Sequence, residues 1–235
     1  MAHDLRLRSA ALLLAATCFA TLANSASVGI ETNPVNTCDF GAFVDEADPA
    51  GLNVRAAPLP AARILGKLPP TFIDPSMEFP IHVRVRVEVE VIGARNGWFL
   101  IRNAQDNDTL TERPARPMFS GEGWVSGTRL VVKSQADVGR ARPDPRAPAV
   151  LRVGDDETLD NDVLVAAGRL VDCKGKWAQV EFADQRIPAS SRSALKVDTA
   201  ARSGLPPGRF RAWIDRICAI QETSCDGLAL PDAPP

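Results

Sequence analysis

The sequence predicts an all-β protein with two similar halves behind an N-terminal targeting segment. Short apolar segments are separated by Gly and Pro, a pattern typical of strands joined by turns. One segment, Ile81–Ile92, alternates apolar and polar residues without a break, which indicates a half-buried strand. The order of Arg, Gly and Trp residues in the first half returns in the second, which indicates a divergent repeat.

The N-terminus predicts a secretory signal peptide over residues 1–26. Arg6 and Arg8 precede the uncharged segment Ala10–Ala23, and small residues follow as far as Ser27. The apolar segment is shorter than the ~20 residues that a transmembrane helix needs, so we favour a cleaved signal over a membrane anchor.

This signal predicts export, either to the periplasm or out of the cell. Cys18 lies in a poor lipobox, which disfavours a lipoprotein, and no later segment is apolar enough for an integral membrane span. Cleavage removes two basic residues and one acidic residue, so the formal net charge of −2 becomes −3. A weakly acidic chain without a basic face is not typical of nucleic-acid-binding proteins.

Four of the five cysteines remain after cleavage, and an oxidising compartment favours disulfides. Cys218 and Cys225 lie close in sequence and are our preferred local pair, which leaves Cys38 to pair with Cys173. The sequence alone permits the other pairings as well. A zinc site is disfavoured because the chain has no Cys-x2-Cys or Cys-x-His spacing.

Within the first half, strands are predicted at Ala42–Val44, around Val54, and at Ile64–Leu68, Trp98–Ile101 and Arg129–Val132. Asn96-Gly97 predicts a turn, since both residues tolerate positive φ. In Ile81–Ile92 the Ile and Val side chains would face the core. The opposite, solvated face would carry His82, Arg84, Arg86, Glu88 and Glu90. So long a strand is expected to bend or to protrude as a hairpin arm.

Four segments of the first half follow one another in a set order. They are Leu52-Asn53-Val54-Arg55, the strand Ile64–Leu68, and the Gly-Trp pairs that end at Trp98 and Trp124. In this order they resemble a bacterial SH3 (SH3b) domain. The resemblance implies a small SH3-like β-barrel over residues 38–133, used for binding, with Arg55, Trp98 and Trp124 as ligand contacts. Two insertions, Pro70–Arg84 and Asn103–Ser120, depart from the family pattern.

The second half is predicted to be a divergent SH3-like barrel over residues 134–227, joined through the linker Lys133–Asp137 and followed by a disordered tail, residues 228–235. Arg140 stands where Arg55 stood, Trp177 matches Trp98, and Trp213 matches Trp124. In so small a barrel the core needs large apolar side chains, so we favour core packing for each Trp, and a place in a ligand groove is the alternative for some of them.

The side chains disfavour an enzyme. A Ser-His-Asp or Cys-His site would need His82, the one histidine after the signal, which we expect on a strand surface. The acidic run Asp155–Asp162 lacks the glycine of a calcium loop, so we expect a solvated turn and no metal. Paired carboxylates leave a cryptic hydrolase as a minor alternative.

We therefore expect a non-catalytic exported binding protein without a cofactor. By the family resemblance, its ligand is peptidoglycan peptide or another envelope component. The alternative is a protein–protein interaction or inhibitor module that acts on an envelope protein.

Overall fold

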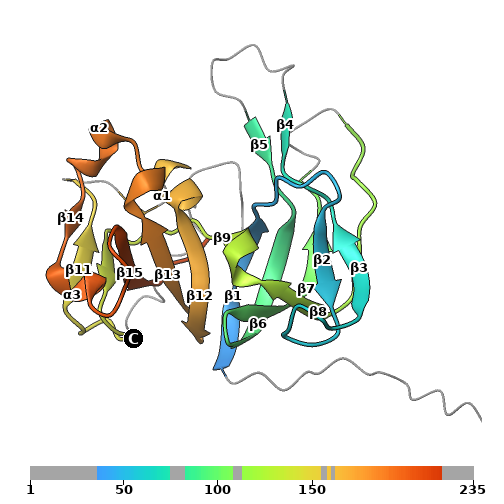
Figure 1. Ribbon diagram of the computed structural model, residues 1–235, viewed down its shortest axis with the longest axis horizontal. Helices are drawn as coiled ribbons and strands as arrows, with labels where there is room; N and C mark the ends of the chain where they lie inside the picture. Colours follow the sequence, from blue (N-terminus) through green and yellow to red (C-terminus); the bar gives the residue numbers. More distant parts are fainter. Residues whose placement is uncertain (1–35, 75–82, 108–112, 155–157, 160–161, 219–235) are drawn as a thin grey trace, which may run out of the picture.

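A computed structural model describes residues 36–74, 83–107, 113–154, 158–159 and 162–218 (Figure 1). It confirms the all-β prediction, with one large sheet from each half of the chain, a small two-stranded sheet and a few short helices. The predicted signal peptide, the C-terminal tail, His82 and most of the acidic run lie outside these residues. No helix in the described part of the chain is long and apolar enough to cross a bilayer.

The first half forms a seven-stranded sheet in the order β3-β2-β8-β7-β6-β1-β9. Its strands are β1 (Asn36–Val44), β2 (Leu52–Arg55), β3 (Ile64–Leu68), β6 (Glu88–Arg95), β7 (Trp98–Gln105), β8 (Gly123–Ser126) and β9 (Leu130–Val131), with the 3-10 turn η2 (Gly127–Arg129) before β9. The predicted turn between β6 and β7 is confirmed: Asn96 and Gly97 have φ values of 52° and 77°, as tight hairpins require.

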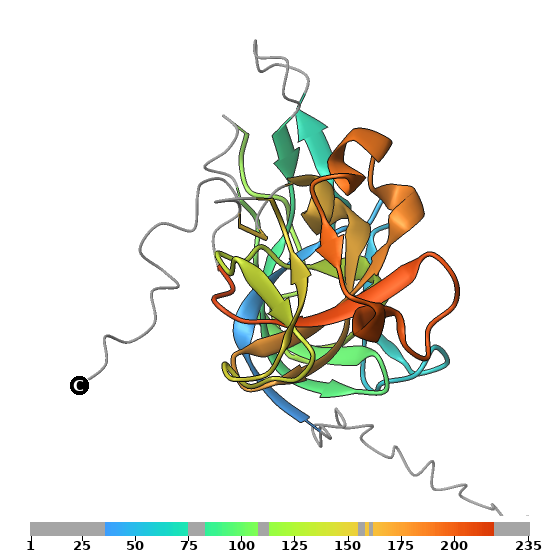
Figure 2. The same ribbon diagram turned by 90° about the vertical axis from the view of Figure 1, so that its left-hand side faces the viewer.

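The second half forms a six-stranded sheet in the order β12-β13-β15-β10-β11-β14. Its strands are β10 (Val138–Arg140), β11 (Ala149–Arg152), β12 (Gly168–Lys174), β13 (Trp177–Ala183), β14 (Lys196–Val197) and β15 (Arg209–Ile214). Short helical segments connect its strands: α1 (Asp162–Ala167), η3 (Asp184–Arg186), α2 (Ala189–Arg192) and α3 (Thr199–Arg202). Figure 2 views the molecule from the side of this half.

The two sheets share one strand order. The run β11-β10-β15-β13-β12 of the second sheet repeats the run β3-β2-β8-β7-β6 of the first. A register shift lies between Val54 and Arg55 in β2, and its counterpart lies between Gly139 and Arg140 in β10. Within the described residues neither sheet closes on itself as a barrel.

The alternating segment bends, as predicted, but it is not one continuous strand. Its first part, β5 (Val83–Val85), pairs with β4 (Phe72–Asp74) in an arm that projects from the first sheet (Figure 1). The remainder enters the main sheet as β6. The prediction that Arg86 lies on a solvated face is wrong, because its side chain is buried, with 3% of the residue exposed. The core face agrees with the prediction, since Val87, Val89 and Val91 are buried.

The predicted disulfide between Cys38 and Cys173 is confirmed, and it joins the two halves. Here β1 lies beside β12 (Figure 1). The Asp39 N–H donates to the Gly175 carbonyl, and the Gly175 N–H donates to the Thr37 carbonyl, both at 2.9 Å. Cys218 is also disulfide-bonded, while Cys225, its predicted partner, lies outside the described residues.

An ion pair continues this joint at the other end of β1. Asp45 accepts a hydrogen bond from Arg169 of β12 at 2.8 Å and lies 3.5 Å from Arg86 Nε. Burial lowers the pKa of Arg169, as do the neighbouring guanidinium groups, while Asp45 opposes the shift. An arginine guanidinium is not deprotonated in proteins, so Arg169 stays charged and its pair with Asp45 remains ionic.

The predicted linker is part of the packed interior. Ser134 and Ala136 have 0% exposure, and Ser134 Oγ donates to the Asp215 carbonyl. Apolar residues of both halves belong to one continuous core. The two sheets are therefore held together by core packing, a disulfide and an ion pair.

Candidate functional site

The predicted ligand contacts of the first half share one face of its sheet. Arg55 lies opposite Trp124, Leu100 lies opposite Trp124, and Trp98 lies opposite Ser126. Side chains two residues apart on a strand point to the same face, so Trp98 and Trp124 are diagonal neighbours. The structure thus brings together all three residues that the resemblance implied.

This first face is closed at its centre. Trp124 has 0% exposure and Leu100 has 3%, so Trp124 has no surface to offer a ligand and is a core residue. This burial agrees with the core-packing role expected of the tryptophans, and the ligand contact that the resemblance implied at Trp124 stays a prediction. Trp98 is half-buried, and Arg55 donates from Nη1 to the Ala62 carbonyl at 2.9 Å.

The second insertion is fastened along the edge of the first sheet. The Phe119 N–H donates to the Lys67 carbonyl at 3.0 Å, and its ring lies over Gly66, where a Cβ atom would collide with it. Arg116 donates to both carboxylate oxygens of Asp106, at 2.6 and 2.9 Å. Burial would raise the pKa of Asp106, but the hydrogen bonds and charge of Arg116 hold that pKa below its usual value.

The second half repeats the same arrangement. Arg140 lies opposite Trp213, and Gln179 lies opposite Trp213 on its other side. Trp177 lies two residues before Gln179, so Trp177 and Trp213 are diagonal neighbours as Trp98 and Trp124 are. Both indoles of this face are half-buried, and so both keep exposed surface. We name Arg140, Trp177, Gln179 and Trp213 the paired-tryptophan face.

A sequence signal marks this equivalence. The pattern Arg-Ala-x-Pro-x-Pro-x-Ala occurs at residues 55–62 and again at residues 140–147. In both copies the first Arg donates to the carbonyl of the last Ala, at 2.9 Å from Arg55 and 2.8 Å from Arg140. The guanidinium thus holds the Pro-rich turn against the strand that faces the tryptophan.

Basic residues border the paired-tryptophan face. Glu181 accepts from Arg211 Nε at 2.7 Å and from Arg209 Nη1 at 3.2 Å. The side chains of Arg211 and Arg209 are 41% and 35% exposed, against 17% for Glu181. Two guanidinium groups therefore share one carboxylate, and the group carries a net positive charge. Sequence reasoning did not assign any of these three residues to a site.

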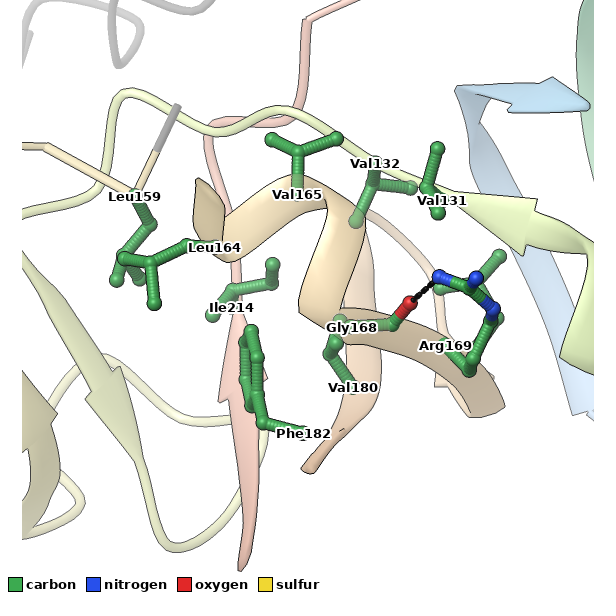
Figure 3. Close-up of a pocket in the computed structure, with 11 residues that line it drawn as sticks. Val131, Val132, Leu159, Leu164, Val165, Gly168, Arg169, Val180, Phe182 and Ile214 are labelled. Atoms are coloured by element: carbon green, nitrogen blue, oxygen red, sulfur yellow. Dashed lines mark hydrogen bonds between the residues drawn. The ribbon is translucent and has the colours of Figure 1, made fainter. Parts of the chain in front are cut away.

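Two cavities lined by described residues of the second half do not offer a better site. One lies beneath α1, between Leu164, Phe182 and Ile214 and beside Arg169, whose guanidinium donates to the Gly168 carbonyl (Figure 3). Its volume of about 10 Å³ is room for roughly one water molecule. A larger cavity of about 230 Å³ has aliphatic walls with Ser190 and Ser191, and none of the described residues that line it is charged.

The described residues contain no group of three or more His, Cys, Asp or Glu side chains placed to hold a metal ion. Comparison of the chain with known protein families, with curated proteins and with solved structures finds no significant match. The candidate site therefore stands on the geometry of the chain itself, and the paired-tryptophan face is the surface in which the repeated motif stays exposed.

Proposed function

We propose that this chain is an exported, non-catalytic binding protein of two SH3-like units, and that it binds cell-wall peptide or another envelope component. The observation that carries the proposal is the exposed indole surface of Trp177 and Trp213 on neighbouring strands. The site lies in the second half, since the equivalent Trp124 of the first half is fully buried.

The shared strand order supports two related units, each built around an Arg-Trp pair across neighbouring strands. The disulfide between Cys38 and Cys173 supports export, because disulfides persist in oxidising compartments. Both lines agree with the motif order that resembles a bacterial SH3 domain.

Physical chemistry favours a ligand of extended shape. Indole rings provide a large contact area at a low cost in conformational entropy, and they are enriched at binding hot spots. Two such rings on adjacent strands form a platform along which the alternate residues of an extended peptide can lie. Gln179, between them, adds an amide that can donate and accept hydrogen bonds.

The test is co-sedimentation of the purified mature protein with insoluble peptidoglycan. We expect saturable binding that is lost in the variant with both Trp177→Ala and Trp213→Ala. Trp98→Ala is the matched control, because it removes a half-buried indole from the equivalent position of the closed face. Absence of binding by the wild type, or equal loss in the control, would contradict the proposal.

A second function is favoured by the projecting arm. Ile73 in β4 is 50% exposed, and Leu59 and Ile64 of the first half are 44% and 46% exposed. These side chains suit contact with a protein partner in the envelope, as in an interaction or inhibitor module. Cross-linking from a photoreactive residue at position 73, compared with the same residue at position 192 on α2, would test it. This function requires a single cross-linked product with an envelope protein, formed from position 73 and not from position 192.

A further inference from the structure

We propose that the ligand of the paired-tryptophan face carries a carboxylate, and that Arg209 and Arg211 bind this group beside Trp213. This inference rests on the proposed function and names the chemical class of the ligand, an extended peptide with a free carboxylate.

Register places the arginines next to the indole. Arg140, Trp213 and Gln179 form one row across β10, β15 and β13. The next row on the same face pairs Arg211 with Glu181. Since Arg211 and Trp213 are two residues apart on β15, their side chains are neighbours on that face, and Arg209 follows in the same direction. A ligand that contacts Trp213 can therefore also contact Arg211, the next side chain along β15 on the same face.

The local charge favours an anion. Glu181 is shared by two arginines that are both more exposed than it is. Arg211 uses Nε and Nη2 for this carboxylate, and Arg209 uses Nη1, which leaves further N–H donors on each guanidinium. Asp172 on β12, which lies opposite Gln179, already accepts from Asn36 Nδ2 and from the Cys173 N–H.

The first half shows the opposite charge pattern. Two residues before Trp124, where the second half has Arg211, the first half has Glu122. Arg102 takes the place of Glu181 and pairs with Glu90 at 2.7 Å. The exposed indoles and the basic group thus occur together in one half only, so we expect one carboxylate site per chain.

In this arrangement Arg209 and Arg211 are the anion-binding residues, and Glu181 is a positioning residue. Glu181 holds the two guanidinium groups at the edge of the aromatic surface. A peptide carboxylate can accept charge-assisted hydrogen bonds from them, while the apolar part of the peptide covers Trp213 and Trp177.

The experiment measures the affinity of a synthetic wall stem peptide with free carboxylates, and of the same peptide with every carboxylate amidated, by tryptophan fluorescence. We expect amidation to weaken binding about tenfold or more, because hydrogen bonds to charged groups are among the stronger ones. Arg211→Gln and Arg209→Gln should weaken binding of the free peptide similarly and leave the amidated peptide nearly unaffected. Arg192→Gln, which removes an exposed arginine of α2, is the control for net charge.

The outcomes separate the two proposals. Equal binding of both peptides, or unchanged binding by Arg211→Gln, would overturn the carboxylate site while leaving the binding function in place. Failure of the wild type to bind either peptide would count against the proposed function itself, and the inference would fall with it. Circular dichroism of each variant establishes that a loss of affinity is not a loss of fold.

Discussion

Trp213 lies directly opposite Arg140 in the register of β15 and β10. The same relationship joins Trp124 to Arg55 in the first half, but there the indole is fully buried. One backbone arrangement therefore provides a core residue in the first sheet and a partly exposed residue in the second. This difference in exposure locates the candidate site in the second sheet.

Removal of the two indoles should have unequal effects on stability. Trp124→Ala should lower the free energy of unfolding by about 3–5 kcal/mol, the usual cost of deleting a fully buried aromatic side chain. Trp213→Ala should cost less than Trp124→Ala, because part of the Trp213 surface already faces water. Urea unfolding followed by circular dichroism measures both values. Equal losses would contradict the assignment of core and surface roles.

The disulfide between the halves should contribute strongly to stability. Its cysteines are separated by 135 residues in sequence, and removal of native disulfides typically costs about 2–5 kcal/mol. The double variant Cys38→Ala and Cys173→Ala should therefore unfold at a lower denaturant concentration than the oxidised wild type. Under reducing conditions the difference should shrink. A double variant as stable as the oxidised protein would show that core packing alone holds the halves together.

Gly127 should be intolerant of any side chain. A Cβ atom there would collide with the Leu170 carbonyl oxygen of the second half and with the Phe99 ring of the first. Gly127→Ala should lower stability by about 1–3 kcal/mol, as overpacking usually does. Gly97→Ala is an informative comparison, because its Cβ meets no atom and only its positive φ opposes the change. A neutral Gly127→Ala would mean that the two halves pack less closely than described.

The Asp106–Arg116 pair should make stability depend on pH in acid. The pKa of Asp106 is lowered in the folded state, so its contribution is present above the unfolded pKa of about 3.9. That contribution is lost as the pH falls through the lower folded pKa. Asp106→Asn should therefore be less stable than the wild type at pH 7, and the gap should narrow toward pH 2. Unfolding curves at several pH values measure the difference in the free energy of unfolding between the two proteins. A difference that does not change with pH would contradict the ion pair.

Local patterns predicted much of the backbone. Asn96-Gly97 has the residues that a tight hairpin needs, and the spacing of Arg140, Trp177 and Trp213 predicted their places in the second sheet. The pairing of Cys38 with Cys173 also agrees, although sequence left other pairings open. These features depend on turn-forming residues and on the alternation of apolar and polar residues, and both can be recognised within a short segment of sequence.

Features that depend on distant segments could not be predicted. Arg86 occupies a polar position of an alternating strand, yet Asp45, far away in sequence, lies beside it in the interior. Trp124 and Trp213 occupy equivalent positions, and only the packed structure distinguishes their exposure. Alternation tells which residues share a face but not what covers that face.

The most direct test of the account follows the four tryptophan indole N–H signals by NMR while the carboxylate-bearing stem peptide is added to the protein. We predict that the signals of Trp177 and Trp213 shift with saturation, whereas those of Trp98 and Trp124 stay in place. Shifts confined to Trp98 and Trp124, or no shift at any indole, would contradict a binding site on the second sheet.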